Sequence, residues 1–349
     1  MKKFKIAGRT GQSIVLVGES LRNVSKYVPT DQAVIITDTT VLELYHEALP
    51  PLWNVIKVGT GEAIKTLDTV KTVYEELLAL EADRSCFIVG IGGGIVCDIA
   101  GFAASTYMRG VRFGFVATTL LSQVDASVGG KNGVNLKGYK NIVGVFNQPE
   151  FVICDTALLK TLPQKEILCG LSEVVKHAVI GDEKLFAYIE HNYEKALKLN
   201  QEVIERFIYD SIVIKSSIVN QDETEKAIRR KLNFGHTFGH AFEKITGMTH
   251  GEAVSAGMVV AARLSEKKGL LSKEDVRRLE SLLANLNLPT SVSVDCEAVM
   301  DALKKDKKRQ GDLIHMVLLA GLGSAVVKEI PIQELELEMM NLDNWKSAP

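Results

Sequence analysis

The sequence predicts a two-part α/β protein, in which an α/β domain with a mainly parallel sheet precedes a mainly α-helical domain. Over about the first 150 residues, short apolar runs alternate with helical patterns, as in parallel sheets. After about residue 155, long helical patterns dominate. The length of 349 residues, with 46% hydrophobic residues, also favours two domains over one.

Strands are expected where short runs are rich in β-branched and aromatic residues. These runs are 13–17, 33–37, 54–58, 86–89 and 113–116. Helices are expected between them, at 39–48 and 63–80. Ligands of such sheets bind beyond the carboxyl ends of the strands, so the residues that follow each run are candidates for binding.

The second part is predicted to be helical with one small β-hairpin. Helical patterns cover 164–181, 183–197, 200–221, 229–246, 250–268, 273–286 and 296–305. The hairpin is expected from 314–319 and 324–328, around two glycines. Two X-Pro pairs, at 148–149 and 162–163, bracket the change in pattern. We therefore predict domains at 1–155 and 156–349, with a ligand site in the cleft between them.

Composition argues against several classes of partner. The formal net charge is −2 and 24% of residues are charged, which does not favour nucleic acid or an anionic membrane. Five cysteines occur without C-x-x-C spacing, so disulfides and a thiolate zinc site are not expected. No signal-peptide pattern occurs, nor an apolar run near the roughly 18 residues of a membrane span. We expect a cytoplasmic protein.

The segment around two histidines is the strongest indication of a site. Read as one helix over 229–246, it places Arg229, Asn233, His236 and His240 along one face. Solvated helix faces usually hold Lys and Glu, so two imidazoles and an amide favour a ligand or acid–base role. The spacing of four between His236 and His240 alone suggests a metal pair.

Three consecutive glycines follow the strand predicted at 86–89. Gly92, Gly93 and Gly94 lead into a helical pattern, so backbone N–H groups and a helix N-terminus can approach an anion. The spacing is not G-x-G-x-x-G, and a tight turn needs glycine anyway, so nucleotide binding stays open on this motif alone. Asp38, at the end of an earlier strand, either binds a ribose hydroxyl or caps the next helix.

Several motifs in order along the chain resemble one known family. They are Gly92–Gly94 with Asp98, Tyr107-Met-Arg-Gly110, residues 118–131 (TTLLSQVDASVGGK), Lys140-Asn141, residues 171–176 (LSEVVK), residues 233–240 (NFGHTFGH) and residues 250–253 (HGEA). Together they resemble the 3-dehydroquinate synthase family of sugar phosphate cyclases over nearly the whole length. The resemblance implies a Rossmann-like N-terminal domain and a helical C-terminal domain.

The reaction implied by the resemblance is a redox-neutral cyclisation. It converts 3-deoxy-D-arabino-heptulosonate 7-phosphate into 3-dehydroquinate and phosphate, within aromatic amino-acid biosynthesis by the shikimate pathway. NAD oxidises the C5 hydroxyl, phosphate leaves by β-elimination, the ketone is reduced again, and ring opening with an aldol closure follows. One divalent metal, zinc or cobalt, and a homodimer are implied as well.

Residue roles carry over from the matching motifs. The implied metal ligands are Glu173, His236 and His250, which replaces the His236/His240 pair. The implied cofactor contacts are Asp38, Glu62, Lys65, Gly93, Gly94, Asp98, Thr118, Thr119, Leu121, Asp125, Lys140 and Thr161. The implied substrate contacts are Arg109 (from the neighbouring subunit), Lys131, Lys140, Asn141, Lys176, Lys215, Arg229, Asn233, His240 and Lys307. Within these sets, the implied catalytic group is Lys131, Lys176, His240, Asp125 and Asn141.

Three alternatives remain open. Another sugar phosphate cyclase would use the same site on a different phosphorylated sugar. A metal-dependent polyol or glycerol-phosphate dehydrogenase would release NADH and would not need so many substrate cations. A binding homologue without activity would not need the polar residues of the site, because folding does not require them.

Overall fold

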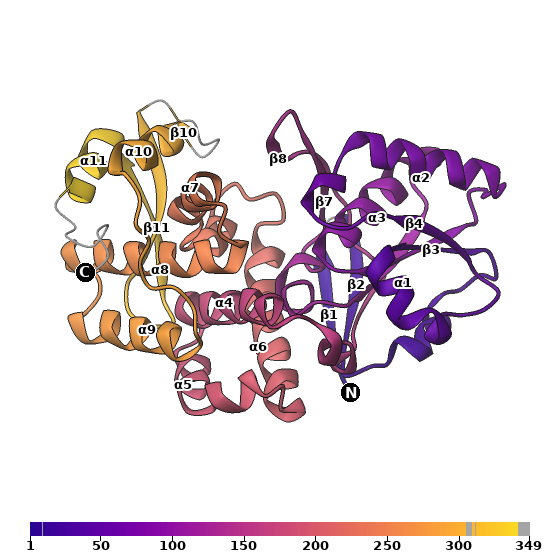
Figure 1. Ribbon diagram of the computed structural model, residues 1–349, viewed down its shortest axis with the longest axis horizontal. Coiled ribbons are helices and arrows are strands. Elements are labelled where there is room, and N and C mark those ends of the chain that lie inside the picture. Colours follow the sequence, from indigo (N-terminus) through magenta and orange to yellow (C-terminus); the bar gives the residue numbers. More distant parts are fainter. Residues whose placement is uncertain (9, 305–308, 311, 341–349) are drawn as a thin grey trace. The chain divides into compact units, whose positions relative to one another are not determined.

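The computed structural model describes residues 1–8, 10–304, 309–310 and 312–340. The chain forms two compact units (Figure 1). The first unit holds Met1–Pro163 and Ile204–Thr224, and the second holds Gln164–Val203 and the chain from Glu225 onward. The predicted boundary after residue 155 stays a prediction. Among the described residues, every helix is too short or too polar to cross a bilayer.

The first unit is built on a seven-stranded sheet in the order β1-β2-β9-β6-β5-β3-β4. All neighbouring pairs are parallel except β1 with β2, which form an antiparallel edge hairpin. The strands are β1 Lys2–Gly8, β2 Gly11–Val17, β3 Ala33–Asp38, β4 Asn54–Val58, β5 Phe87–Gly92, β6 Arg112–Ala117 and β9 Phe151–Cys154. The central strands are fully buried, which is why their sequences are continuous apolar runs.

Among its described residues, this unit also contains three whole α-helices and a second hairpin. The helices are α1 Thr39–Tyr45, α2 Leu67–Ala79 and α3 Gly94–Thr106. A turn of π-helix at Ser122–Ala126 precedes the hairpin of β7 Lys131–Leu136 and β8 Tyr139–Phe146, which stands beside α2 and α3 in Figure 1. Helix α6 Gln201–Gln221 belongs to this unit from Ile204 onward. The six parallel strands, β2 to β6 and β9, all end at the same edge of the sheet, where the loop after each strand begins.

The second unit is mainly helical, as predicted. Its helices are α4 Gln164–Gly181, α5 Glu183–Leu197, α7 His236–Thr246, α8 His250–Lys267, α9 Lys273–Asn285, α10 Cys296–Lys304 and α11 Ile332–Met340. A small antiparallel sheet joins β10 Arg309–Gln310, β11 Leu313–Leu319 and β12 Ala325–Pro331. The hairpin predicted at 314–319 and 324–328 therefore exists and is longer than expected.

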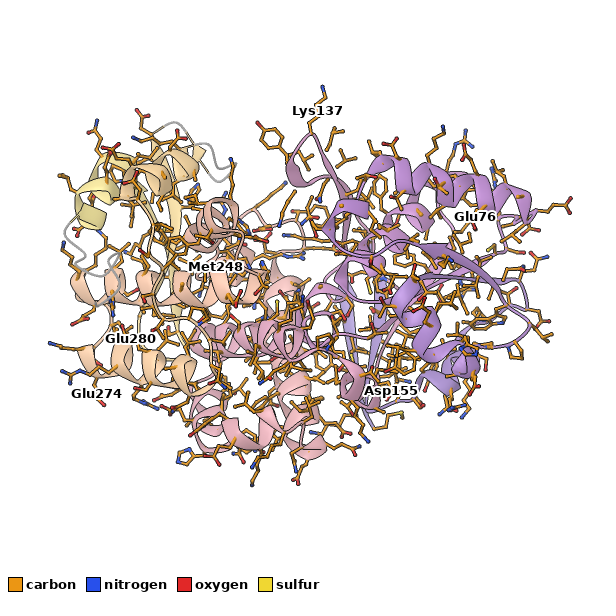
Figure 2. The ribbon with its side chains drawn as sticks, viewed as in Figure 1. Glu76, Lys137, Asp155, Met248, Glu274 and Glu280 are labelled. Atoms are coloured by element: carbon orange, nitrogen blue, oxygen red, sulfur yellow. The ribbon has the colours of Figure 1, made fainter. Side chains whose placement is uncertain are left out.

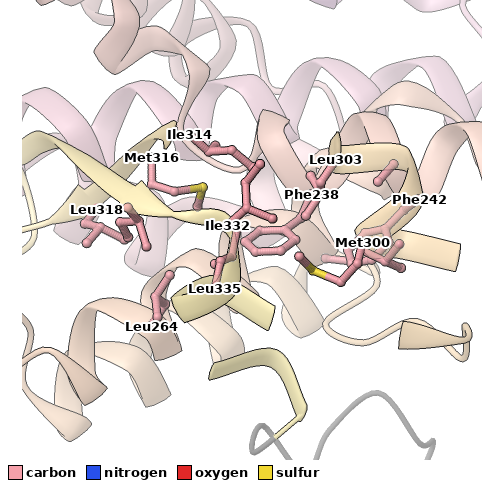
Figure 3. Packing of buried hydrophobic residues seen from close by; sticks show 14 of the residues in the cluster. Phe238, Phe242, Leu264, Met300, Leu303, Ile314, Met316, Leu318, Ile332 and Leu335 are labelled. Carbon is pink, nitrogen blue, oxygen red and sulfur yellow. The ribbon is translucent and has the colours of Figure 1, made fainter. Parts of the chain in front are cut away.

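The core of the second unit lies between α7, α8, α10 and the β11–β12 hairpin (Figure 3). Phe238 and Phe242 project from one face of α7, four residues apart, into this cluster. Met316 and Leu318 reach it from β11, where alternate residues share a face. Both phenylalanines are buried. Their burial fixes the opposite face of α7, which carries His236 and His240.

The structure corrects the single helix predicted over 229–246. A short 3₁₀ helix spans Ile228–Asn233, and α7 begins only at His236. Gly235 between them has φ of 77°, in the left-handed region that breaks a helix. Arg229 and Asn233 therefore do not continue the helical face of His236 and His240.

Close helix contacts in the second unit depend on glycine. A Cβ added at Gly257 of α8 would lie 2.1 Å from the carbonyl oxygen of Gly235 and 2.8 Å from the amide nitrogen of Gly239. A Cβ at Gly239 would in turn lie 3.1 Å from the Cα of Val254. The backbones of α7 and α8 thus approach at a distance that a side chain would prevent.

Gly257→Ala is expected to lower the free energy of unfolding by about 1–3 kcal/mol, because overpacking would force these two helices apart. Lys244→Ala, an exposed change on α7, is the control and should shift it by no more than about 0.5 kcal/mol. Urea unfolding followed by circular dichroism measures both. Equal midpoints for Gly257→Ala and the wild type would contradict the steric argument.

Candidate active site

The carboxyl edge of the first unit's sheet gathers the residues matched to a cofactor. Register pairs Thr37 with Ile91, and Gly92 with Ala117, so β3, β5 and β6 end at one level. The matched residues at or after these strand ends and the end of β4 are Asp38, Glu62, Lys65, Gly93, Gly94, Thr118, Thr119 and Leu121. This is the edge at which parallel α/β sheets bind ligands.

The turn from β5 into α3 is a cradle of backbone atoms. Gly93 is the residue before the first turn of α3, so the helix N-terminus faces this edge. A Cβ on Gly94 would lie 2.9 Å from the Cβ of Ala126, and a Cβ on Gly93 would lie 3.0 Å from a methyl carbon of Thr119. The glycines therefore serve close packing against the next loop, while they leave amide groups near any bound anion.

A buried ion pair lies behind this turn. Lys65 pairs with Asp98 on α3, and its Nζ also donates to Oδ1 of Asn141 on β8 at 2.6 Å. Burial raises the pKa of Asp98, and the Lys65 ammonium opposes that rise. A contact thus joins two residues matched to the cofactor and one matched to the substrate.

Asp38 and Thr161 hold positions set by neighbouring groups. Asp38 accepts a hydrogen bond from the amide of Val41 at 2.9 Å, so it caps α1. Burial raises the pKa of Asp38, and backbone hydrogen bonds from Val41 and Thr40 oppose the rise. Thr161 lies 2.5 Å from the hydroxyl of Tyr45, which also donates to the carbonyl of Leu158.

Asp125 and Lys215 are joined, although they are 90 residues apart. Lys215 on α6 forms an ion pair with the carboxylate of Asp125 and donates to its backbone carbonyl at 2.7 Å. Both side chains are largely buried. The contact aligns two groups that the motifs match to substrate and cofactor.

In the second unit, Glu173, His236 and His250 come together as a candidate metal group. One ligand atom from each residue lies within 4.8 Å of the others. Oε1 of Glu173 is 3.5 Å from Nε2 of His236 and 3.3 Å from Nε2 of His250. A carboxylate with two imidazoles is a donor set that zinc takes in catalytic sites.

The outer nitrogens of both imidazoles have partners that orient the rings. Nδ1 of His236 lies 3.1 Å from the carbonyl oxygen of Phe234, and Nδ1 of His250 lies 4.0 Å from Glu243. A backbone carbonyl or carboxylate at this position directs the other nitrogen toward a metal. The residues present therefore fit a divalent ion bound through the two Nε2 atoms and Glu173.

Local sequence places each ligand. A Cβ at Gly251 would lie 2.3 Å from the Cα of Cys169, so glycine lets α8 begin directly against α4. Glu252 accepts the amide hydrogen of Thr249 at 2.9 Å, a capping contact that starts α8 at His250. The close crossing of α7 and α8 then brings His236 beside His250.

The electrostatics of this group favour positive charge around Glu173. The Glu173 side chain is 0% exposed and also pairs with Lys176 on the next turn of α4, itself 1% exposed. Burial lowers the pKa of His250, but hydrogen bonding and charge from Glu173 and Glu243 outweigh it and raise that pKa to about 9. A divalent cation at this point would likewise place positive charge beside the Glu173 carboxylate.

His240 lies beside the metal group without joining it. Its ring centroid is 5.5 Å from that of His236 and 6.5 Å from that of His250. The candidate metal group contains His250 in its place. The position suits contact with a molecule bound at the metal.

Glu225 is a polar group that the sequence analysis missed. Its Oε1 accepts a hydrogen bond from Nδ2 of Asn233 at 2.5 Å. Arg229, between them in sequence, is 2% exposed. Glu225 lies eight residues before Asn233, and the sequence alone does not indicate that the two side chains meet. The hydrogen bond between them becomes evident only in the folded chain.

Four further residues belong to the implied substrate set, namely Arg109, Lys131, Lys140 and Lys307. Arg109 is exposed and has φ of 70°, in a turn where Met108 is also left-handed. Lys307 lies outside the described residues. Lys131 and Lys140 lie on the β7–β8 hairpin and are exposed.

A parallel α/β unit with a glycine turn, followed by a helical unit with a carboxylate–imidazole group, is typical of nucleotide- and metal-dependent enzymes. Comparison with known proteins is more specific. Models of the N-terminal and C-terminal parts of 3-dehydroquinate synthase match residues 55–169 and 170–309. A 3-dehydroquinate synthase of Dehalococcoides mccartyi strain CBDB1 is 41% identical over 339 residues, covering 93% of this chain and 94% of the relative. The chain belongs to the 3-dehydroquinate synthase family.

Solved structures of related cyclases share the fold. A 2-deoxy-scyllo-inosose synthase with carbaglucose-6-phosphate, NAD⁺ and Co²⁺ aligns with a TM-score of 0.86 and 29% identity, covering 97% of this chain and 99% of that chain. The 2-epi-5-epi-valiolone synthase of Streptomyces hygroscopicus, with NAD⁺ and Zn²⁺ bound, aligns with a TM-score of 0.84 and 26% identity, covering 95% and 97%.

His236→Ala is expected to abolish zinc binding while the fold is kept, because it would remove one of the three side chains of the candidate metal group. The loss of affinity should exceed the roughly 10–100-fold seen when a residue that merely orients a ligand is removed. Metal content after dialysis, measured by mass spectrometry, tests this. His240→Ala is the matched control on the same helix and should retain zinc. Unchanged zinc content in His236→Ala would refute the ligand assignment.

Proposed function

We propose that this chain converts 3-deoxy-D-arabino-heptulosonate 7-phosphate into 3-dehydroquinate and inorganic phosphate, and so acts as a carbon–oxygen lyase. The observation that carries the proposal is the Glu173–His236–His250 group in a chain that belongs to the 3-dehydroquinate synthase family. The cations that the motifs match to substrate suit a molecule with both carboxylate and phosphate.

NAD and one divalent metal are proposed as cofactors. Related cyclases have been solved with NAD⁺ and with Co²⁺ or Zn²⁺. Glu173, His236 and His250 would hold the metal, and the carboxyl edge of the first unit's sheet would hold the nucleotide. When bound, NAD supplies reversible hydride acceptance and the metal polarises a substrate hydroxyl.

The chain's own residues bind, orient and exchange protons. The ammonium groups of Lys131, Lys140 and Lys215 would neutralise the anionic substrate, and Asp125 holds Lys215 in one orientation. Lys176 is fixed by Glu173, so its charge stays beside the metal group. These groups supply orientation and electrostatic stabilisation for phosphate elimination.

His240 is the proposed proton-exchanging group of the second unit. It lies next to both imidazoles of the metal group and is half-buried. Asn233, held by Glu225, would donate or accept hydrogen bonds to substrate hydroxyls. A neutral imidazole next to a bound hydroxyl can take up and return a proton near neutral pH.

A homodimer and a cytoplasmic location are also proposed. Arg109 is exposed, so it can reach the phosphate of a substrate bound to a second copy. The five cysteines are present as thiols, which suits a reducing compartment.

Another sugar phosphate cyclase is the second candidate function. The alignment with 2-deoxy-scyllo-inosose synthase favours it, since that enzyme shares the fold at 29% identity. It predicts turnover of a different phosphorylated sugar at the same site. The 41% identity to a 3-dehydroquinate synthase favours the first candidate.

The test supplies zinc, NAD⁺ and 3-deoxy-D-arabino-heptulosonate 7-phosphate and follows phosphate, 3-dehydroquinate and NADH together. Equal amounts of phosphate and 3-dehydroquinate, with no net NADH, are expected. No turnover on this substrate, with turnover of another sugar phosphate, would support the second candidate. Net NADH would point to a simple dehydrogenase.

Lys131→Ala is expected to lower kcat about 10–100-fold, because it removes one hydrogen bond between a charged group and the substrate. The affinity for NAD should change little. Steady-state kinetics and NAD⁺ titration measure the two quantities. Lys137→Ala is the control, because Lys137 extends from the tip of the same hairpin (Figure 2). Equal losses of turnover and NAD affinity would place Lys131 in the cofactor site instead.

A further inference from the structure

Asn135 on β7 belongs to neither the proposed substrate set nor the proposed cofactor set, and it lies at an irregularity of the hairpin. Val134 pairs with Val143, whereas Leu136 pairs with Tyr139, so the register shifts at Asn135. Such a bulge releases a residue from its ladder and redirects it. Asn135 instead forms a parallel bridge with Thr66, outside the hairpin.

Three hydrogen bonds tie Asn135 to two different segments. Its backbone N–H donates to the carbonyl of Lys65 at 2.8 Å, and its Nδ2 donates to Oε1 of Glu62 at 2.7 Å. Its Oδ1 accepts the backbone N–H of Asn141 at 2.8 Å. The two faces of one amide therefore join the loop after β4 to strand β8.

The residues joined in this way belong to two proposed sets. Glu62 and Lys65 are matched to the cofactor and Asn141 to the substrate, and its neighbour Lys140 is matched to both. Asn141 has φ of 52°, in the left-handed region, which is uncommon outside glycine although asparagine adopts it more often than most residues. Its backbone is held by Asn135 and its side chain by Lys65, which donates to Oδ1 at 2.6 Å.

We propose that Asn135 is a positioning residue, which holds Glu62–Lys65 and Lys140–Asn141 in the one arrangement that binds nucleotide and substrate. The inference rests on the proposed function, because it takes both sets of contacts from it. Groups held in their bound conformation lose less freedom on binding, so each ligand binds more tightly to a linked pair of segments. Removing the link should weaken both ligands, although Asn135 touches neither.

The Nδ2 contact to Glu62 and the Oδ1 contact to Asn141 can be tested separately by two substitutions of Asn135. Asn135→Ala removes both side-chain contacts. Asn135→Asp keeps an acceptor for the Asn141 amide but places a carboxylate against Glu62, which like charges disfavour. The alanine variant should therefore weaken nucleotide and substrate, and the aspartate variant should weaken mainly the nucleotide.

The experiment measures NAD⁺ binding by calorimetry on the whole chain without substrate, and then KM and kcat for 3-deoxy-D-arabino-heptulosonate 7-phosphate at saturating NAD⁺. We expect a 2- to 10-fold weaker Kd for NAD⁺ in both variants, about the effect of one hydrogen bond. KM should rise in Asn135→Ala and stay near the wild-type value in Asn135→Asp. Leu136→Ala, an exposed neighbouring change, should alter none of these values.

Wild-type Kd and KM in Asn135→Ala would overturn the inference, as would equal effects of Leu136→Ala. A weaker Kd for NAD⁺ together with an equally raised KM in Asn135→Asp would also overturn it, since a general loosening of the hairpin predicts that result. If Asn135→Ala does not fold, the inference is tested by Asn135→Asp alone, in which the Kd for NAD⁺ should rise while KM stays near the wild-type value. Failure of the wild type to bind NAD⁺ would instead refute the cofactor in the proposed function.

Discussion

The buried carboxylate of Glu173 is the constraint on which the second unit is built. A fully buried negative charge is stable only with partners that supply positive charge and hydrogen bonds. Lys176 supplies one, and the imidazoles of His236 and His250 face the other oxygen. Three helices must converge to do this, and the glycines at their crossings make the approach possible. A metal ion at this point would complete the same charge balance.

In the first unit, the place of the candidate cofactor residues is set by the backbone of the sheet and not by a buried charge. Parallel strands end at one level, so the loops after β3, β4, β5 and β6 meet whatever their sequences. Only then do particular side chains matter, such as Lys65 beside Asp98 and Lys215 beside Asp125. Binding of a nucleotide at this edge and of an anionic substrate near it is consistent with both the sheet and its charges.

Much of this was predictable from the sequence, and the failures have physical causes. Buried strands and amphipathic helices are local patterns, so β3 to β6 and α4, α5, α8 and α9 lie close to their predicted ranges. The β7–β8 hairpin was not predicted, because asparagine and glycine, which are depleted in strands, interrupt β7, although β8 is rich in β-branched and aromatic residues. Helical spacing alone favoured His236 with His240, whereas the structure groups His236 with His250, because a crossing of two helices is invisible in local periodicity. His250 was predicted as a metal ligand only from the family resemblance. The contact of Glu225 with Asn233 could be found only from the fold.

X-ray absorption at the zinc edge of the zinc-loaded protein would test the central claim most directly. Zinc held by Glu173, His236 and His250 should show two imidazole nitrogens and oxygen donors at about 2.0–2.2 Å, and one of the two imidazole signals should be lost in His250→Ala. A thiolate sulfur at about 2.3 Å, or an unchanged spectrum in that variant, would contradict the assignment of Glu173, His236 and His250.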